Sequence, residues 1–575
     1  MAGNYWTSLA THRVSRRAAL RGAAVGVAGL SGAALIGCGG GDKKAEEKPA
    51  SGTTGGASGT ATASAPAAAQ PKKGGRIARA QAGDPVTFDQ HGQSTNLVNR
   101  PASPMFNTLV QFDPKSSDEK STDIIPDLAD SWEIAKDGLT YTFKLKQGVK
   151  FHDGTPFVAG DIKQSLQRQI TPPKGLVPPR QDQLKVIKTM ETPDDFTLKL
   201  TMSRPSSPLS MLPILGQGWM SIYAQKDIAN DKFDWKNKAN GTGPFRDMKY
   251  ERGVKVTMER NKEYHVKDRP YLDGLDIYLM PQDSSRDAAF QSGQLHLLEA
   301  MSVGSAVAVK AAAGDKAVWN RRSSLGFSVM NYNTSKAPWN DERVRRAVNL
   351  AINRDDAIKV VSKGEGVFGG YLLPGGEWAL PEAEIRKIPG YEQQGPNSVA
   401  DAKKLLDAAG VKDGLAVTIL VRQAAYEDLC LFTADQLAKI GMKSKQDIVE
   451  TAVAYDRMNK RDFDLTPWGH GVSLDDPDAL WAEFYIKGAP RNYSELSTPG
   501  IEDAYLKQSV ELDPAKRKAL VNDLQKVSLP ALGKSIYYWS TSQSIYYKTV
   551  QGWVQHVSGG GGYNNMKYQD IWLNA

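Results

Sequence analysis

Apolar and polar residues alternate with a period of two in several short stretches of the chain, and this pattern predicts half-buried β-strands. The clearest example is a hairpin in which residues 132–134 and 140–145 flank the turn residues Asp137 and Gly138. Aspartate and glycine favour such a turn, because aspartate bonds to nearby backbone and glycine tolerates positive φ. Further strands are predicted at residues 76–80, 109–112, 196–202, 273–279, 294–298, 326–331, 415–421, 443–449 and 536–539.

Between these strands the apolar residues recur every three or four positions, which predicts amphipathic helices. Val344 and Ala347 follow this spacing behind Asn340, which we expect to be the N-cap of their helix. A second helix is predicted to begin with a capping box formed by Ser398 and Asp401. Because strands and helices alternate along the chain, the pattern predicts an α/β fold with mixed sheets. Other helices are predicted at residues 160–170, 285–293, 428–440 and 514–524.

The first 37 residues follow a different pattern. Arg16 and Arg17 precede an apolar run rich in glycine and alanine, which ends in Leu35-Ile36-Gly37-Cys38. This order is typical of an export signal, and its ending resembles a bacterial lipoprotein signal. The run is too short and too rich in glycine to cross about 30 Å of hydrocarbon. We therefore expect residues 1–37 to be a signal peptide and Cys38 to carry lipid, while the export route, twin-arginine or general, stays open.

Residues 38–75 are mostly small or polar and contain no aromatic side chain, so they predict a flexible linker. Removal of the signal takes four arginines and lowers the net charge from +8 to +4. That charge is small for a body spanning residues 76–575 and argues against a nucleic-acid partner. No later apolar stretch is long enough to cross a membrane. We expect an extracytoplasmic body that is held at the cell membrane by its lipid anchor.

Familiar catalytic and metal-binding motifs are absent from the sequence. Cys430 is the one cysteine besides Cys38, so an internal disulfide is not expected, and its apolar neighbours predict burial. There is no His-Glu-x-x-His or Cys-x-x-Cys motif, no Gly-x-Ser-x-Gly elbow and no phosphate-binding P-loop. We therefore expect a binding protein without metal or cofactor rather than an enzyme. A hydrolase whose two carboxylates are distant in the sequence stays open.

The body also carries a series of motifs. They are Pro126-Asp127-Leu128-Ala129 before Ser131-Trp132-Glu133, Gly148-Val149-Lys150-Phe151-His152-Asp153-Gly154, Gly241-Thr242-Gly243-Pro244-Phe245, Arg260-Asn261 with Tyr264, and Val344-Arg345-Arg346-Ala347 before Ala351-Ile352-Asn353-Arg354. As an ordered set that covers essentially the whole body, these motifs resemble the family 5 extracytoplasmic solute-binding proteins of ABC importers, the peptide/nickel-binding group.

The resemblance implies a two-lobe fold like that of periplasmic binding proteins, in which a hinge closes the lobes on a ligand. It implies a first lobe with an extra subdomain at residues 76–322, a second lobe at 323–540 and a C-terminal return at 541–575. The implied function is capture of a solute, most often a peptide or peptide-like compound, and its delivery to the permease and ATPase subunits of an ABC importer. We expect a monomer; an exported hydrolase and a receptor for a signalling partner are the alternatives.

The resemblance also implies residues that meet the ligand. In peptide-binding members an aspartate pairs with the ammonium group of the ligand, and the aligned residue here is Ser473, which carries no charge. Asp475 lies two residues on, and whether it substitutes stays open, as does the choice among peptide, oligosaccharide, chelated metal and other ligands. Trp378 is expected in the cleft because its glycine-rich loop offers no face for burial, whereas Trp468 fits cleft and core equally. The remaining cleft candidates are Asp89, Arg180, Asn331, Tyr332 and His470.

Overall fold

The computed structural model describes residues 70–574, except residues 94, 300, 424–425, 473, 490 and 559–565 and the side chains of residues 451–452. The expected signal peptide, Cys38 and most of the expected linker lie outside the described residues, and so does Ser473. Within the described ranges, no helix combines the length and the apolarity that crossing a bilayer requires.

The largest sheet among the described residues contains eleven strands in both orientations. β1 (Arg76–Gln81) runs parallel to β10 (Gly274–Leu279), and β14 (Ala416–Arg422) runs parallel to β15 (Lys443–Val449), so the expected mixed sheet is confirmed. In spatial order the strands are β15, β14, β16 (Leu465–Gly471), β12 (Ala317–Tyr332), β17 (Lys534–Tyr547), β11 (Leu297–Glu299), β1, β10, β9 (Lys255–Arg260) and β8 (Phe245–Glu251), and β13 (Gly366–Val367) pairs with β17.

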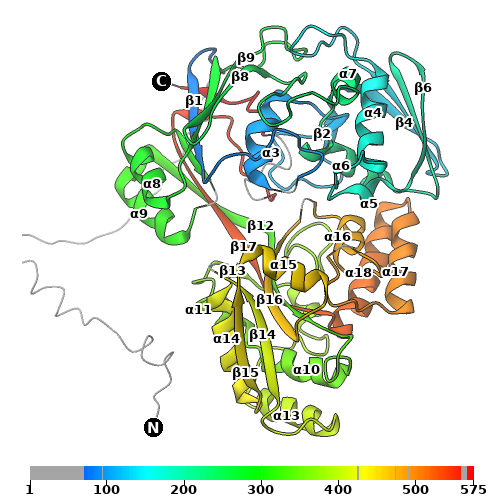
Figure 1. Cartoon of the computed structure of the whole chain (residues 1–575), viewed down its shortest axis with the longest axis vertical. Helices are drawn as coiled ribbons and strands as arrows, with labels where there is room; N and C mark the ends of the chain where they lie inside the picture. Colours follow the sequence, from blue (N-terminus) through cyan, green and yellow to red (C-terminus); the bar gives the residue numbers. More distant parts are fainter. Residues whose placement is uncertain are drawn as a thin grey trace, which may run out of the picture. The chain divides into compact units, whose positions relative to one another are not determined.

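The antiparallel strands β12 and β17 run through the middle of this sheet and connect its two ends (Figure 1). We name the strands β1 and β8–β11, with the elements packed on them, lobe 1, and β14–β16 with their elements lobe 2. Pairing of β12 with β17 is regular as far as Ser323 opposite Thr541, and it resumes at Phe327 opposite Trp539 after a shift of register. The irregularity therefore falls where the two strands pass from one lobe to the other.

Lobe 1 contains a second, four-stranded antiparallel sheet in the described chain, in the order β4 (Ala129–Ile134), β5 (Thr140–Leu145), β7 (Thr197–Met202) and β6 (Ile187–Asp194). Its β4–β5 hairpin is the one predicted from the sequence, and Gly138 takes the positive φ that the turn needs. Inward residues of the neighbouring strands β5 and β7, such as Tyr141 and Leu198, form one apolar cluster with the helices. Those helices are α4 (Ala159–Ile170), α5 (Gln181–Leu184), α6 (Pro208–Gly216) and α7 (Gln225–Ile228).

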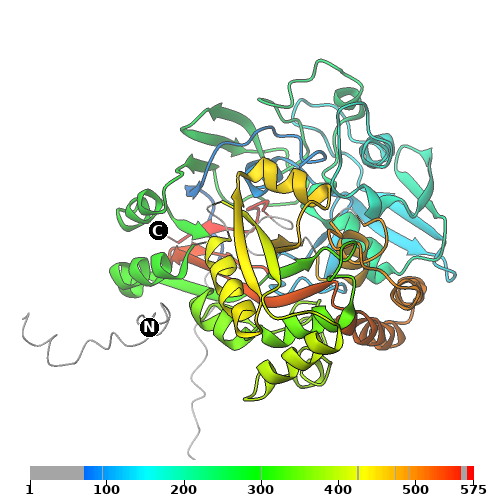
Figure 2. The same cartoon turned by 60° about the horizontal axis from the view of Figure 1, so that its bottom comes forward.

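Lobe 1 also contains β2 (Val110–Phe112), β3 (Ile124–Pro126), α3 (Asn96–Ala102), α8 (Asp283–Gln291) and α9 (Val303–Ala313). Lobe 2 holds α10 (Glu342–Ala351), α11 (Arg354–Val360), α12 (Glu382–Ile385), α13 (Ser398–Ala408), α14 (Glu427–Lys439), α15 (Thr451–Asn459), α16 (Pro477–Phe484), α17 (Pro499–Val510) and α18 (Pro514–Ala531). Figure 2 turns lobe 2 forward and shows the yellow strands beside helices of the same lobe.

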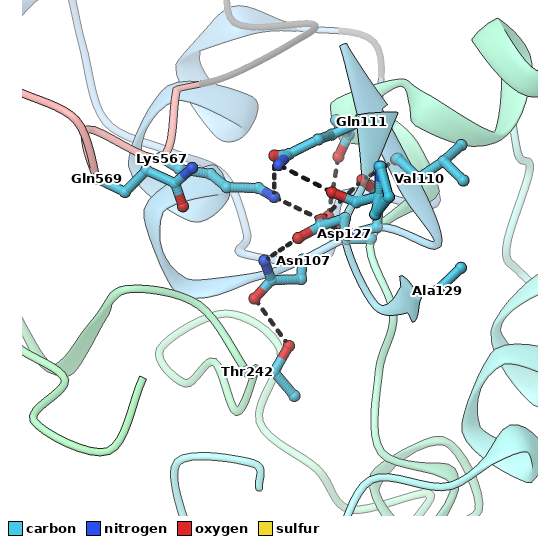
Figure 3. Close-up of polar contacts among 12 residues, drawn as sticks. Asn107, Val110, Gln111, Asp127, Ala129, Thr242, Lys567 and Gln569 are labelled. Carbon is cyan, nitrogen blue, oxygen red and sulfur yellow. Dashed lines mark hydrogen bonds and ion pairs between the residues drawn. The ribbon is translucent and has the colours of Figure 1, made fainter. Parts of the chain in front are cut away.

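The C-terminal segment packs into lobe 1. β18 (Val550–Gln551) pairs with β19 (Trp572–Leu573), and Tyr568 joins the apolar cluster around Ile77. Lys567 is buried between lobe 1 side chains, where its ammonium group donates to Gln111 at 2.7 Å and pairs with Asp127 (Figure 3). Because both charges are buried, each depends on the other for its compensation.

Three sequence predictions need correction. The strands expected at 326–331 and 536–539 are longer than predicted, since they are parts of β12 and β17, which have 16 and 14 residues. The sequence pattern missed the additional residues because these polar stretches pair in the sheet without alternating apolar residues. The N-cap of α10 is Asp341, which accepts from the amide of Arg343 at 2.8 Å, rather than Asn340. The capping box of Ser398 and Asp401 is wrong, because Ser398 is already helical and its hydroxyl accepts from Gly395.

Candidate functional site

A cavity of about 290 Å³ opens between the two lobes. Lobe 1 lines it with the segment between β2 and β3, at Asp118, Glu119 and Lys120, and the C-terminal segment contributes Val557. Lobe 2 lines it with residues 373–377 and with Asp475, which comes from the loop between β16 and α16. Arg322 and Ser323 on β12 complete the lining. Charged groups from distant parts of the chain therefore converge at the place where β12 enters lobe 2.

A tight turn in lobe 2 positions Asp475. The amide of Gly376 donates to the carbonyl of Leu373 at 2.8 Å, and Gly375 has the positive φ that such a turn demands. The amide of Leu373 then donates to Asp475 Oδ1 at 3.3 Å. A Cβ atom on Gly376 would lie 2.3 Å from Asp475 Oδ2, so only glycine lets the carboxylate approach this closely.

Burial, together with the negative charges of Asp476 and Glu377, raises the pKa of Asp475 to about 7, although the hydrogen bond from Leu373 opposes this shift. The two cations on the cavity wall face another carboxylate. Arg322 pairs with Asp118 at 2.7 Å and donates to the carbonyl of Gln555 at 3.0 Å, and the ammonium of Lys120 lies 3.8 Å from Asp118. Asp475 is therefore a carboxylate whose ionised form would gain from a positive charge in the cavity.

Glu377 and Ser121 connect the lobes beside this cavity. The amide of Ser121 in lobe 1 donates to Glu377 Oε2 at 3.1 Å, and its hydroxyl lies 3.0 and 2.9 Å from the two carboxylate oxygens. Glu119, on the lobe 1 side, accepts from the amide of Ser558 at 3.1 Å. The sequence analysis did not predict a role for Ser121, Glu119 or Glu377, since no motif marks them. The glycine pair Gly375-Gly376, next to Glu377, was the one sequence signal for a turn at this place.

The predicted residues of lobe 1 lie in polar contacts within that lobe. Asp89 forms an ion pair with Arg168 at 2.6 Å, with two parallel hydrogen bonds, and also caps the amide of His91. The guanidinium of Arg180 lies 4.2 Å from the ring centre of Trp219 and donates to a backbone carbonyl at 3.1 Å. Neither Asp89 nor Arg180 lines the cavity described above.

Three predicted residues of lobe 2 are buried on its central strands. Asn331 accepts from the ammonium of Lys534 at 3.0 Å, and the hydroxyl of Tyr332 lies 2.7 Å from that of Ser535. Trp468 packs against Tyr455, with ring centres 5.1 Å apart. These three side chains face neighbours in lobe 2, so their role as ligand contacts stays a prediction.

His470 and Trp378 are also buried in lobe 2. His470 is neutral, because burial and the nearby charge of Arg491 hold its pKa well below the ordinary value. The expectation that Trp378 lacks a surface for burial is wrong. Its side chain is 1% exposed and lies over the guanidinium of Arg517, 4.6 Å from the ring centre, because the turn at residues 375–376 directs it toward α18. Among the described candidates, Asp475 lines this cavity.

Comparison with known proteins agrees with this architecture. Residues 123–492 match the family described as bacterial extracellular solute-binding proteins, family 5 Middle. Heme-binding protein A of Haemophilus influenzae is 30% identical over 66% of this chain and 71% of its own length. The dipeptide-binding protein of Escherichia coli is 26% identical over 82% of this chain and 90% of its own.

Solved structures of two-lobe periplasmic binding proteins share the fold. DppA of Helicobacter pylori, in complex with the peptide STSA, is 25% identical and superposes with a TM-score of 0.74 over 88% of this chain and 99% of its own. AgaA of A. tumefacien R10, in complex with agropinic acid, is 25% identical, with a TM-score of 0.73 over 87% and 99% of the two chains. The chain therefore belongs to family 5 of the bacterial extracellular solute-binding proteins.

Proposed function

We propose that this protein captures a peptide or peptide-like solute with a positively charged group between lobes 1 and 2 and that Asp475 receives that charge. As a member of its family the protein is an extracytoplasmic ligand-capturing component of an ABC importer. The observation that carries the proposal is the position of Asp475 on the cavity wall, where the turn at residues 373–376 holds it and where no cation of the described residues pairs with it. Relatives named for dipeptides and glutathione, and a neighbour in complex with a peptide, support this ligand class.

The chemistry of Asp475 suits an ammonium group. A cation that enters the cavity favours the ionised carboxylate and lowers its raised pKa. The contact is then a charge-assisted hydrogen bond inside a partly closed cavity, where water competes less for either partner. No catalytic step forms part of this proposal: the ligand leaves as it entered, for the permease and ATPase subunits.

A matched set of peptides tests the proposal. Dialanine and its N-acetylated form differ in the charged amine, so calorimetry should show tighter binding of dialanine by the unmodified protein. Asp475→Asn should weaken dialanine binding by about 1.5–3 kcal/mol, the value of a hydrogen bond to a charged group, and leave the acetylated peptide unaffected. Tight dialanine binding that Asp475→Asn does not weaken would contradict the role of Asp475. Chemical conversion of the peptide would favour a hydrolase instead.

We further propose that a lipid at Cys38 is the membrane attachment. The motivation is the sequence Leu35-Ile36-Gly37-Cys38 behind a positive and an apolar segment. Cys38→Ala should move the protein from the membrane fraction to the soluble fraction, because the acyl chains supply most of the binding free energy. Cys430→Ala is the control, since its thiol is buried in lobe 2. Retention of the Cys38 variant in membranes after a high-salt wash would contradict the anchor.

A further inference from the structure

Lobe 2 reaches lobe 1 through a polar contact beside the cavity. Ser121 is nearly buried, and both its amide and its hydroxyl donate to the carboxylate of Glu377 at distances of 2.9–3.1 Å. The two residues are 256 positions apart and belong to different lobes. A carboxylate that accepts from both donors of one serine forms a directional, charge-assisted contact. This contact exists only while the lobes are together.

A second contact lies on the segment that follows the cavity wall. Leu474 and Ala479 are buried, but the apolar cluster that contains them is that of the four-stranded sheet of lobe 1. Asp476, between them, accepts from the hydroxyl of Ser210 on α6 at 3.1 Å. In lobe 2 the same carboxylate pairs with Arg517 at 3.0 Å and caps α16 through the amide of Asp478 at 2.9 Å. The segment 474–479 is therefore held firmly in lobe 2 while its apolar side chains enter lobe 1.

The two contacts flank Asp475. Leu474 is its neighbour in sequence, and Glu377 shares the cavity wall with it. We propose that the Glu377–Ser121 contact and the insertion of Leu474 into lobe 1 form a latch, which raises ligand affinity by stabilising the closed lobes. The part that concerns affinity rests on the proposed capture of a solute; the part that concerns closure does not.

The physical reason is population shift. A protein that binds ligand in its closed arrangement loses apparent affinity in proportion to the fraction of molecules that are open. Removal of a latch contact opens the lobes in the absence of any ligand, and removal of a pure ligand contact does not. The two roles therefore differ in a measurement made on the free protein.

Electron–electron distance measurements test the latch. Spin labels at Lys136→Cys in lobe 1 and Lys403→Cys in lobe 2, both exposed positions, report the separation of the lobes in the otherwise unmodified full chain. Without ligand, we expect a closed population that falls at least fivefold relative to the open one in Glu377→Gln and in Leu474→Ala. The double variant Ser121→Ala with Glu377→Gln should open the lobes no further than Glu377→Gln alone, because the two substitutions remove the same contact.

The controls make the same kinds of substitution, glutamate to glutamine and leucine to alanine, at exposed positions elsewhere in lobe 2. Glu384→Gln neutralises an exposed glutamate that pairs with Lys387, and Leu506→Ala truncates an exposed leucine of α17. Both should keep the distances of the parent protein. Unchanged distances in Glu377→Gln and Leu474→Ala, or a parent protein whose labels stay at the long distance, would overturn the latch.

Dialanine binding then separates the two proposals. If dialanine binds, its Kd should rise in Leu474→Ala, which leaves the cavity lining intact, by the factor by which the closed fraction falls. An unchanged Kd in that variant would contradict the effect on affinity. If dialanine fails to bind the parent protein, the proposed ligand class is wrong, while the distances measured without ligand still decide the latch.

Discussion

At the scale of single residues, the environment rather than the residue type decides the chemistry. Asp475 and Asp89 are both aspartates predicted near a ligand, but Asp89 is neutralised by a bidentate pair with Arg168. Asp475 has two other carboxylates nearby, and burial together with their charges raises its pKa to about 7, although one backbone amide donates to it. A partner of opposite charge lowers the pKa of a carboxylate, and its absence in a buried place raises it.

This difference predicts how stability depends on pH. A carboxyl group whose pKa rises from 3.8 to about 7 on folding is protonated more readily in the folded state. Its contribution is therefore favourable at low pH and is lost as the pH rises between about 4 and 7. Because the carboxylate is partly exposed to the cavity, we expect an effect on the order of 1 kcal/mol. Chemical unfolding measures the free energy of unfolding at pH 5 and pH 8, and its decrease between these pH values should be smaller in Asp475→Asn than in the parent protein. An equal decrease in both proteins would contradict this.

Lys567 presents the opposite case, a buried charge that has a partner of opposite charge. It pairs with Asp127, which also accepts from Asn107 at 2.6 Å and from the amide of Thr108 at 2.8 Å (Figure 3). Lys567→Met should lower the free energy of unfolding by about 3–5 kcal/mol, because it leaves a buried carboxylate unpaired. The double variant with Asp127→Asn should recover part of that loss in denaturant unfolding. Strictly additive losses would show that the two charges do not depend on each other.

At the scale of elements, a short turn shapes the cavity wall. Gly375 and Gly376 differ in what surrounds them: nothing lies within 4 Å of a Cβ built on Gly375, whereas one on Gly376 meets Asp475 and the carbonyl of Leu373 at 2.3 and 2.9 Å. Gly375 is required for the positive φ of the turn, and Gly376 is required because a side chain there would prevent the close approach of the Asp475 carboxylate.

Gly376→Ala should therefore displace Asp475 and cost about 1–3 kcal/mol of folding stability through overpacking. Gly375→Asn is the matched control, because asparagine tolerates positive φ and the site has room. Denaturant unfolding measures the stability, and calorimetry with dialanine measures the effect on the site. Equal stability of the two variants would show that the contact between Gly376 and Asp475 is unimportant.

At the scale of the whole molecule, β12 and β17 are the described strands that cross between the lobes. Their register shifts between Ser323 and Phe327, opposite Thr541 and Trp539. We infer a hinge near residues 321–326 and 539–542, because an interrupted ladder yields more easily than a regular one. The lobe bounds at 76–322 and 323–540, with a C-terminal return at 541–575, stay a prediction.

Small-angle scattering tests the hinge. Saturation with the tightest ligand found by thermal shift should reduce the radius of gyration, because ligand contacts from both lobes favour the closed arrangement. Gly326→Pro, which stiffens β12 at the irregularity, should reduce the change, and Gly304→Pro in α9 provides a control within lobe 1. A radius that stays constant while calorimetry confirms binding would contradict the hinge.

Much of the fold could be predicted from the sequence, because local signals suffice for local structure. The β4–β5 hairpin follows from alternation and from Asp137-Gly138, and α14 follows from helical spacing that also buries Cys430. The signals failed where a polar stretch continues a strand, as in β12, since the pairing partner β17 begins more than 200 residues later. A strand whose polar residues are satisfied by a distant partner has no apolar period to reveal it.

The sequence by itself determined the alternation of strands and helices, the order of the family motifs and the absence of familiar catalytic motifs. These are properties of neighbouring residues, and a linear pattern records them. Only the tertiary structure decided that Glu377 meets Ser121, that Leu474 enters the apolar cluster of lobe 1 and that Trp378 turns into the core. Each of these contacts joins residues far apart in the chain, so no local pattern specifies it; packing and charge compensation across the folded molecule do.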